Sequence, residues 1–173
     1  MELKDHIRSV PDFPIPGILF RDITPLLGDA AALREAVACM AAPWRDAGIR
    51  HVAAMEARGF IFGAAIAIEL GAGFVPVRKE GKLPWHTYSA RYELEYRRDV
   101  LHVHRDAVAA ADRVLVVDDL LATGGTAAAV IELIDKLGGK IGGVQFLIEL
   151  VDLKGRDALP GYDVRSVIKF EGD

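Results

Sequence analysis

The sequence predicts an α/β fold in which a mostly parallel, twisted sheet is flanked by helices. Two observations favour this fold. Apolar runs suited to strands alternate with helical segments, and two of these runs end in polar, glycine-containing loops that lead into helices. Such alternation is typical of a parallel sheet with right-handed crossovers. The 173 residues, of which 51% are hydrophobic, are expected to form one domain over residues 1–173.

The first half of the chain is expected to alternate helices and strands. Asp29 is a suitable N-cap because its carboxylate can accept hydrogen bonds from the first N–H groups of a helix, and Pro43 stands near the end of that helix. The expected elements are a short helix over 3–9, an irregular Pro- and Gly-rich segment over 10–28, a helix over 29–41, a strand over 51–55, a helix over 59–70 and a strand over 73–77.

The second half continues the pattern after a polar and aromatic stretch with few helix signals. Two glycines, Gly138 and Gly139, are typical of a helix C-terminus. The expected elements are a long loop or hairpin over 79–99, an extended segment over 101–104, a central strand over 113–117, a helix over 127–137 and strands over 141–150 and 164–169.

The composition excludes several classes of protein. A net charge of −4 argues against nucleic acid as a partner, because nucleic-acid-binding proteins usually carry a basic excess. Cys39 is the single cysteine, so no internal disulfide is possible. No signal peptide is visible and no apolar run reaches about 18 residues. A cytoplasmic protein without a membrane partner is therefore expected.

The most informative segment is the run Val114-Leu-Val-Val-Asp-Asp-Leu-Leu-Ala-Thr-Gly-Gly-Thr126. Asp118 and Asp119 follow a buried strand, where open α/β sheets bind their ligands. The glycines allow backbone amides to close on a ligand, and the helix that follows directs unpaired N–H groups to the same place. The expected phosphate-binding residues are Ala122, Thr123, Gly124, Gly125 and Thr126.

Two carboxylates beside a phosphate cradle suit a ligand such as a ribose phosphate, which carries hydroxyls or a metal next to its phosphate. The P-loop pattern and the dinucleotide-binding pattern are both absent. The plainer alternative is that the two aspartates begin a turn and the Gly-Gly-Thr run merely starts a helix.

A second anion site is expected where the strand over 51–55 leads into its helix. Positive charge from this loop and from the next strand suits a pyrophosphate group, although solvated surface charge is the usual alternative. The residues concerned are Glu56, Ala57, Arg58, Arg78, Lys79 and Lys82.

The carboxylate run resembles the 5-phosphoribosyl-1-pyrophosphate (PRPP) motif of the type I phosphoribosyltransferases. Further segments narrow the resemblance to the adenine phosphoribosyltransferases and extend it over nearly the whole chain. They are Pro11-Asp-Phe-Pro-Ile-Pro-Gly-Ile-Leu-Phe-Arg-Asp-Ile-Thr-Pro25, Glu56-Ala-Arg-Gly-Phe-Ile-Phe-Gly63, Arg78-Lys-Glu-Gly-Lys-Leu-Pro84 and Leu94-Glu-Tyr96. The resemblance implies purine salvage, in which adenine and PRPP give AMP and pyrophosphate.

The resemblance also implies roles for individual segments. Residues 10–28 correspond to a hood in which Leu19, Phe20 and Arg21 surround the adenine, partly through backbone groups. It implies a cis peptide between Glu56 and Ala57, and a homodimer. Mg²⁺ is implied as the cofactor, held by PRPP oxygens and reaching Asp118 or Asp119 only through water.

Residues 79–99 correspond to a mobile lid that excludes water from the reacting sugar. Glycosyl transfer to adenine needs a proton acceptor near the base, and by resemblance this is Glu95, with Tyr96 beside it. The residues alone do not choose between Glu95 and Glu93. The stretch around Trp85 and His86 departs from the family pattern, and Arg97 and Arg98 stand close to where a glycine is common.

Three other readings remain open from the sequence. His102 and His104 would face the same side of a strand and suggest a metal site, but a third ligand is not evident, so no metal site made entirely of protein ligands is expected. A phosphoribosyltransferase for another 6-substituted purine would usually present a side chain, often Lys, to the 6-oxo group. A PRPP-sensing regulatory protein would usually add a DNA-binding domain or lose the lid.

Overall fold

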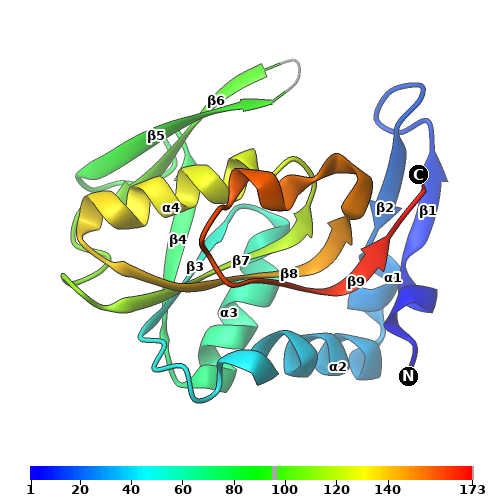
Figure 1. The fold of residues 1–173 in the computed structure, drawn as a ribbon, viewed down its shortest axis with the longest axis horizontal. Helices are drawn as coiled ribbons and strands as arrows, with labels where there is room; N and C mark the ends of the chain where they lie inside the picture. Colours follow the sequence, from blue (N-terminus) through cyan, green and yellow to red (C-terminus); the bar gives the residue numbers. More distant parts are fainter. Residues whose placement is uncertain (95–96, 173) are drawn as a thin grey trace.

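The computed structural model describes residues 1–94 and 97–172, and over this range it forms a seven-stranded sheet in the order β5-β6-β4-β3-β7-β8-β9 (Figure 1). The strands of the parallel part are β3 (His51–Met55), β4 (Gly73–Lys79), β7 (Arg113–Leu121), β8 (Lys140–Leu150) and β9 (Val164–Phe170). At one edge, β5 (Thr87–Leu94) and β6 (Arg97–His104) add an antiparallel hairpin. The predicted fold class is confirmed.

Helices cover both faces of the sheet, α2 (Ala30–Ala41) and α3 (Arg58–Leu70) on one and α4 (Gly125–Leu137) on the other. Successive strand residues point to opposite faces, so each strand contributes to two cores. In β3, Val52 and Ala54 pack on the α2–α3 side, whereas Ala53 packs on the α4 side. Burial on both faces explains why the central strands are apolar over residues 52–55 and 114–117.

The N-terminal segment is more ordered than the sequence suggests. After a 3₁₀ turn, η1 (Leu3–His6), the strands β1 (Arg8–Pro11) and β2 (Leu19–Asp22) pair antiparallel, and α1 (Thr24–Gly28) follows. The prediction of a helix over 3–9 and of irregular structure over 10–28 was therefore wrong in part. Strands of four residues are too short to show a period of two, and half of the prolines and glycines lie within β1 and α1, where they hide the signal of these elements.

Strand β7 extends beyond its predicted end at residue 117. Its pairing with β3 stops at Val117, but its pairing with β8 continues to Leu121. Asp118 and Asp119 thus lie on a strand with one side of its backbone paired and the other side free. The length of β8 explains the difference, because a long neighbour continues the ladder past the end of β3.

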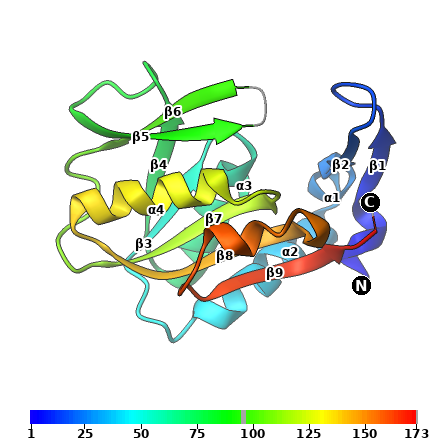
Figure 2. The same ribbon diagram turned by 45° about the horizontal axis from the view of Figure 1, so that its top comes forward.

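Smaller elements complete the chain. A 3₁₀ turn, η2 (Ala42–Trp44), follows α2, and two others, η3 (Val151–Leu153) and η4 (Gly155–Ala158), join β8 to β9. The expectation of a long loop or hairpin over residues 79–99 is confirmed in part: residues 80–86 form a loop, and the hairpin of β5 and β6 begins at Thr87 and continues to His104. The β5–β6 hairpin and the β1–β2 hairpin stand at opposite sides of the molecule, with the ends of β3 and β7 between them (Figure 2). Within the described residues, no helix is long and apolar enough to cross a membrane.

Candidate active site

The two predicted anion-binding loops open onto the same cavity, of about 390 Å³. It lies beyond the carboxyl ends of β3 and β7, which are neighbouring parallel strands. The lining residues are Met55, Glu56, Ala57, Arg58, Asp118, Asp119, Leu120, Ala122 and Thr126. Side chains 60 residues apart in the sequence thus form one site, as the position of both loops after parallel strands predicts.

Asp118 and Asp119 form the floor of this cavity with different partners. The Asp119 carboxylate is buried and pairs with the Arg58 guanidinium, with Nε 3.0 Å from Oδ2. Oδ1 of Asp118 accepts the backbone N–H of Asp119 at 2.9 Å. Asp118 also lies against the start of α3, where a Cβ on Gly59 would come within 2.8 Å of Oδ1. Only glycine leaves room for the carboxylate at this point.

Burial shapes the ionisation of both carboxylates. Burial, together with the adjacent Asp119 carboxylate, raises the pKa of Asp118 well above its ordinary value. Burial also raises the pKa of Asp119, and the Arg58 guanidinium opposes this effect. A ligand that brings hydroxyl groups or positive charge to the pair would relieve the cost of ionising both.

The predicted phosphate cradle is the turn between β7 and α4. Gly124 is the N-cap of α4 and has a φ of +84°, a conformation that glycine adopts readily. A glycine cap has no side chain to accept the first N–H groups of the helix, so they stay available to a ligand. A small cavity of about 70 Å³ lies at this turn, lined by residues 120–127 with Asp118 and Phe146.

The second loop carries a cis peptide between Glu56 and Ala57, as the resemblance implied. The Glu56 carboxylate accepts the Arg78 guanidinium Nε at 3.1 Å and the Lys79 backbone N–H at 2.9 Å. Burial alone would raise the pKa of Glu56, but these hydrogen bonds lower it below its ordinary value. The Glu56 carboxylate therefore orients its basic neighbours and does not itself contact an anion.

Three basic residues of the second site, Arg58, Arg78 and Lys79, are paired with carboxylates. Lys79 Nζ lies 3.1 Å from Asp99 Oδ2 on β6, so Lys79 links β4 to the hairpin. Lys82 is exposed, and its backbone carbonyl lies 3.5 Å from Arg78 Nη1. An anion entering here meets a loop whose positive charges are already partly neutralised.

The hood residues divide between two sides of β2. The Phe20 ring lies 5.2 Å from the Arg58 guanidinium and 5.1 Å from the Phe13 ring, which brings it toward the carboxylate cavity. The Arg21 side chain points elsewhere, stacking on Phe170 at 3.9 Å. A ligand on the Phe20 side would therefore meet the backbone of Arg21 and not its side chain.

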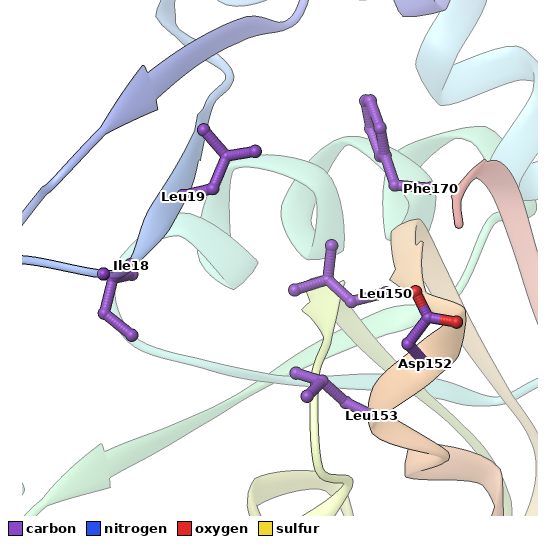
Figure 3. A pocket seen from close by; sticks show the side chains of 7 residues that line it. Ile18, Leu19, Leu150, Asp152, Leu153 and Phe170 are labelled. Atoms are coloured by element: carbon purple, nitrogen blue, oxygen red, sulfur yellow. The ribbon is translucent and has the colours of Figure 1, made fainter. Parts of the chain in front are cut away.

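A second cavity, of about 190 Å³, lies under the hood on the Leu19 side of β2. Figure 3 shows Leu19 and Ile18 of the hood facing Leu150, Leu153 and Phe170 from the C-terminal part of the chain, with Asp152 at the side. Leu150 and Phe170 were not predicted as pocket residues from the sequence. Both are apolar residues at the end of a strand, a feature that any buried strand also shows. They lie near the hood only in the folded chain.

The lid candidates Glu95 and Tyr96 lie outside the described residues. The backbone of Glu93 pairs with that of Arg98 in the β5–β6 hairpin. Leu94 likewise pairs with Arg97, so the hairpin brings together the two described residues on either side of Glu95 and Tyr96. Trp85, in the loop before β5, is 64% exposed.

The histidines of β6 do not form a metal cluster. His102 Nδ1 lies 2.9 Å from the Thr87 hydroxyl, which is a bond within the hairpin. Among the residues that the structure describes, no three His, Cys, Asp or Glu side chains come together as a candidate metal site.

Comparisons with known proteins agree with the geometry. The family model described as the phosphoribosyl transferase domain matches residues 30–167. The adenine phosphoribosyltransferase of Clostridium kluyveri is 56% identical over 171 residues, covering 99% of both chains. The crystal structure of adenine phosphoribosyltransferase from Thermoanaerobacter pseudethanolicus has a TM-score of 0.95 and 53% identity, with 98% of both chains covered.

A third relative was solved with a base bound. The adenine phosphoribosyltransferase of Saccharomyces cerevisiae, in complex with adenine and an imino-altritol bisphosphate, has a TM-score of 0.90 and 38% identity, with 96% of both chains covered.

Proposed function

This chain belongs to the phosphoribosyltransferase family, and we infer that it shares the activity of its adenine phosphoribosyltransferase relatives. It transfers the 5-phosphoribosyl group of PRPP to adenine and releases AMP and pyrophosphate, a reaction of purine salvage. The observation that carries this conclusion is that the carboxylate pair and the basic loop line one cavity, which shares Asp118, Ala122 and Thr126 with the adjoining cavity of the phosphate cradle.

The cradle of residues 122–126 is proposed to hold the 5-phosphate of PRPP. Its support is the glycine N-cap and the unpaired N–H groups of α4, to which a helix N-terminus adds a favourable dipole. Thr123 and Thr126 would add hydroxyl donors on either side of the two glycines.

Asp118 and Asp119 are proposed to face the ribose. The sugar gains positive charge as pyrophosphate leaves C1, and preorganised carboxylates stabilise such charge because they need not reorient. Arg58 keeps Asp119 oriented from the side of the second loop. A ribose hydroxyl at Asp118 would meet a carboxylate that is already held in place by its neighbour's N–H.

Mg²⁺ is proposed to accompany PRPP and, when bound, to neutralise charge on the leaving pyrophosphate. The two aspartates would contact such an ion only through its bound waters, because carboxylate oxygens suit hydrated Mg²⁺ and the ion usually keeps several waters. Arg58 already compensates the charge of Asp119. Substrate oxygens and waters would therefore complete the coordination.

The pyrophosphate is proposed to bind at the loop of residues 56–58 with help from Arg78, Lys79 and Lys82. Arg78 and Lys79 are paired with the carboxylates of Glu56 and Asp99, which an incoming anion can replace or share. Lys79 in particular would exchange Asp99 for a phosphate oxygen, and it stands on the strand that pairs with the hairpin.

The adenine is proposed to lie under the hood against the Phe20 ring, with the backbone of Leu19 and Arg21 at its edge, because the side chains of these two residues lie on the other side of β2. Glu95 is proposed to accept the proton of the attacking nitrogen, and Tyr96 to close over the site. This assignment depends on the Leu94-Glu-Tyr96 run, since neither residue is among those described.

A base panel tests the function directly. The protein is incubated with PRPP, Mg²⁺ and one purine base at a time, and the nucleotide products are separated by chromatography. AMP is expected as the dominant product. Formation of IMP, GMP or XMP at a greater rate than AMP would show that the chain serves a 6-oxopurine instead.

A further inference from the structure

The 5-phosphate cradle packs against a second segment of backbone, the 3₁₀ turn η4 between β8 and β9 (Figure 2). A Cβ on Gly124 would lie 2.3 Å from the carbonyl oxygen of Gly155 and 2.9 Å from Cβ of Ala158. A Cβ on Gly155 would lie 2.4 Å from the carbonyl oxygen of Ala122. The two backbones are thus in direct contact, and the position of Gly155 limits the path of the cradle.

The turn that carries Gly155 is not a relaxed piece of chain. Lys154, which precedes it, has a φ of +52°. A residue with a side chain adopts this left-handed conformation only where its surroundings stabilise it. Leu159, at the other end of the turn, is buried among residues of β7 and α4. The conformation of the turn therefore depends on contacts with other parts of the chain.

Arg156 supplies the strongest polar contacts that hold it. Its Nε and Nη2 donate to the two carboxylate oxygens of Glu149 at 2.7 and 2.8 Å, and Nη1 donates to the Val164 carbonyl at 2.6 Å. Glu149 stands on β8, where it is 5% exposed and opposite Leu121 of β7. A bidentate pair of this kind fixes the orientation of the guanidinium as well as its distance from the carboxylate.

The Glu149 carboxylate is suited to this task. The Arg156 guanidinium holds its pKa below the ordinary value against the opposing effect of burial, and the Ser166 hydroxyl assists by donating a hydrogen bond. Arg156 therefore meets an ionised, buried partner whose position the sheet determines.

We propose that Arg156 is a positioning residue for phosphoribosyl transfer, which through Glu149 fixes Gly155 against Gly124 and so sets the shape of the 5-phosphate cradle. Arg156 touches neither PRPP nor adenine in this proposal. It rests on the assignment of residues 122–126 to the 5-phosphate, and it adds a residue some 30 positions further along the chain to the determinants of PRPP affinity.

The test is Arg156→Met, which keeps the aliphatic stem but removes the guanidinium. A displaced cradle should raise the KM for PRPP by about 10- to 100-fold, because small misplacements of binding groups cost rates and affinities of this order. The affinity for pyrophosphate with Mg²⁺, measured by calorimetry, should stay at the wild-type value because that group binds at the other loop. The KM of Arg156→Lys for PRPP should lie between those of the wild type and Arg156→Met, since lysine keeps the charge but cannot make the bidentate hydrogen bond.

Arg165→Met is the matched control. Arg165 also pairs with a carboxylate, Asp163, at 2.9 Å, but both side chains are about half exposed and lie away from the cradle. Its KM for PRPP should be unchanged. If Arg156→Met does not fold, Arg156→Lys decides the matter by the same measurement.

A lower melting temperature with a wild-type KM for PRPP would overturn the proposal, because it would leave Arg156 a purely structural role. Equal losses of PRPP and pyrophosphate affinity would also overturn it. Gly125→Val distinguishes this failure from failure of the cradle assignment. If Gly125→Val binds PRPP normally, the cradle itself lies elsewhere. If Gly125→Val loses PRPP binding while Arg156→Met keeps it, the cradle assignment stands and only the role of Arg156 is rejected.

Discussion

At the scale of single residues, the carboxylates of β7 have the clearest chemical consequence. Asp118→Asn and Asp119→Asn should each lower kcat by about 10²–10³, the usual cost of removing one electrostatic contact to a charged transition state. Asparagine keeps the size of the side chain, so the melting temperature should change less than the rate. Asp119→Asn also leaves Arg58 without its ionised partner, which predicts the larger rise in the KM for PRPP.

Steady-state rates and thermal melts of the two variants, measured side by side, check this prediction. Near-normal turnover in both would remove the carboxylate pair from the mechanism.

The proton acceptor is the second residue-scale prediction. Glu95→Gln should lower kcat by about 10²–10⁴, because glutamine keeps hydrogen bonding but cannot accept a proton at neutral pH. The affinity for PRPP, measured by calorimetry without adenine, should stay close to the wild-type value. Glu93→Gln is the neighbouring control and should be milder. A crippled Glu93→Gln beside a normal Glu95→Gln would exchange the roles of these two residues.

Individual residues show where sequence reasoning reaches its limit. Asp118, Asp119 and Arg58 could be placed together because both loops follow strands, and the ends of neighbouring parallel strands meet. The pairing of Glu56 with Arg78 and of Lys79 with Asp99 could not be predicted, because it depends on how β4 lies against β3 and β6. Leu150 and Phe170 gave no signal that separates a ligand pocket from an ordinary core.

At the scale of elements, the β7–α4 turn makes the sharpest prediction. Gly125→Val should abolish measurable PRPP binding while leaving most of the fold intact, since a branched side chain would occupy the space where a phosphate meets the backbone. Calorimetric titration with PRPP and Mg²⁺, alongside circular dichroism, tests both halves of this statement. Unchanged affinity would move the phosphate site to another element.

The elements that could be predicted are those with strong periodic patterns. The strand β3 and the ends of α2 and α3 match their predicted limits to within one residue, because buried strands and capped helices leave long apolar signals. The hood hairpin and the turns η3 and η4 could not be predicted. They are short and are stabilised by contacts with distant parts of the chain, such as the bond between Arg156 and Glu149.

At the scale of the whole molecule, α3 connects the site to the surface. Its first residue, Arg58, faces the cavity, and its outer side carries Ile61 and Ile68, which are 41% and 83% exposed. The two isoleucines are seven positions apart, and Ala64 and Ala65 lie between them, so the helix presents an apolar stripe to the outside. Apolar side chains arranged in this way are typical of a surface that another protein covers.

The last prediction is that this stripe forms the contact of a homodimer. Light scattering at micromolar concentration should give about twice the 18.8 kDa mass of one chain, in keeping with the two-fold assemblies that are commonest among soluble proteins. Ile61→Asp combined with Ile68→Asp should give a single-chain mass, because a buried unpaired carboxylate is costly in an apolar contact. Tyr162→Asp, at a side chain of 37% exposure outside α3, is the control and should leave the mass unchanged.

The same variant also tests whether the dimer serves catalysis. Ile61 stands one helical turn from Arg58, so a partner that covers Ile61 reaches within about 5 Å along the helix axis of a residue proposed to bind pyrophosphate. Turnover in the Ile61→Asp, Ile68→Asp protein should therefore fall together with the fraction of dimer. A monomeric protein with full activity would limit the interface to stability, and a wild-type protein of single-chain mass would reject the dimer itself.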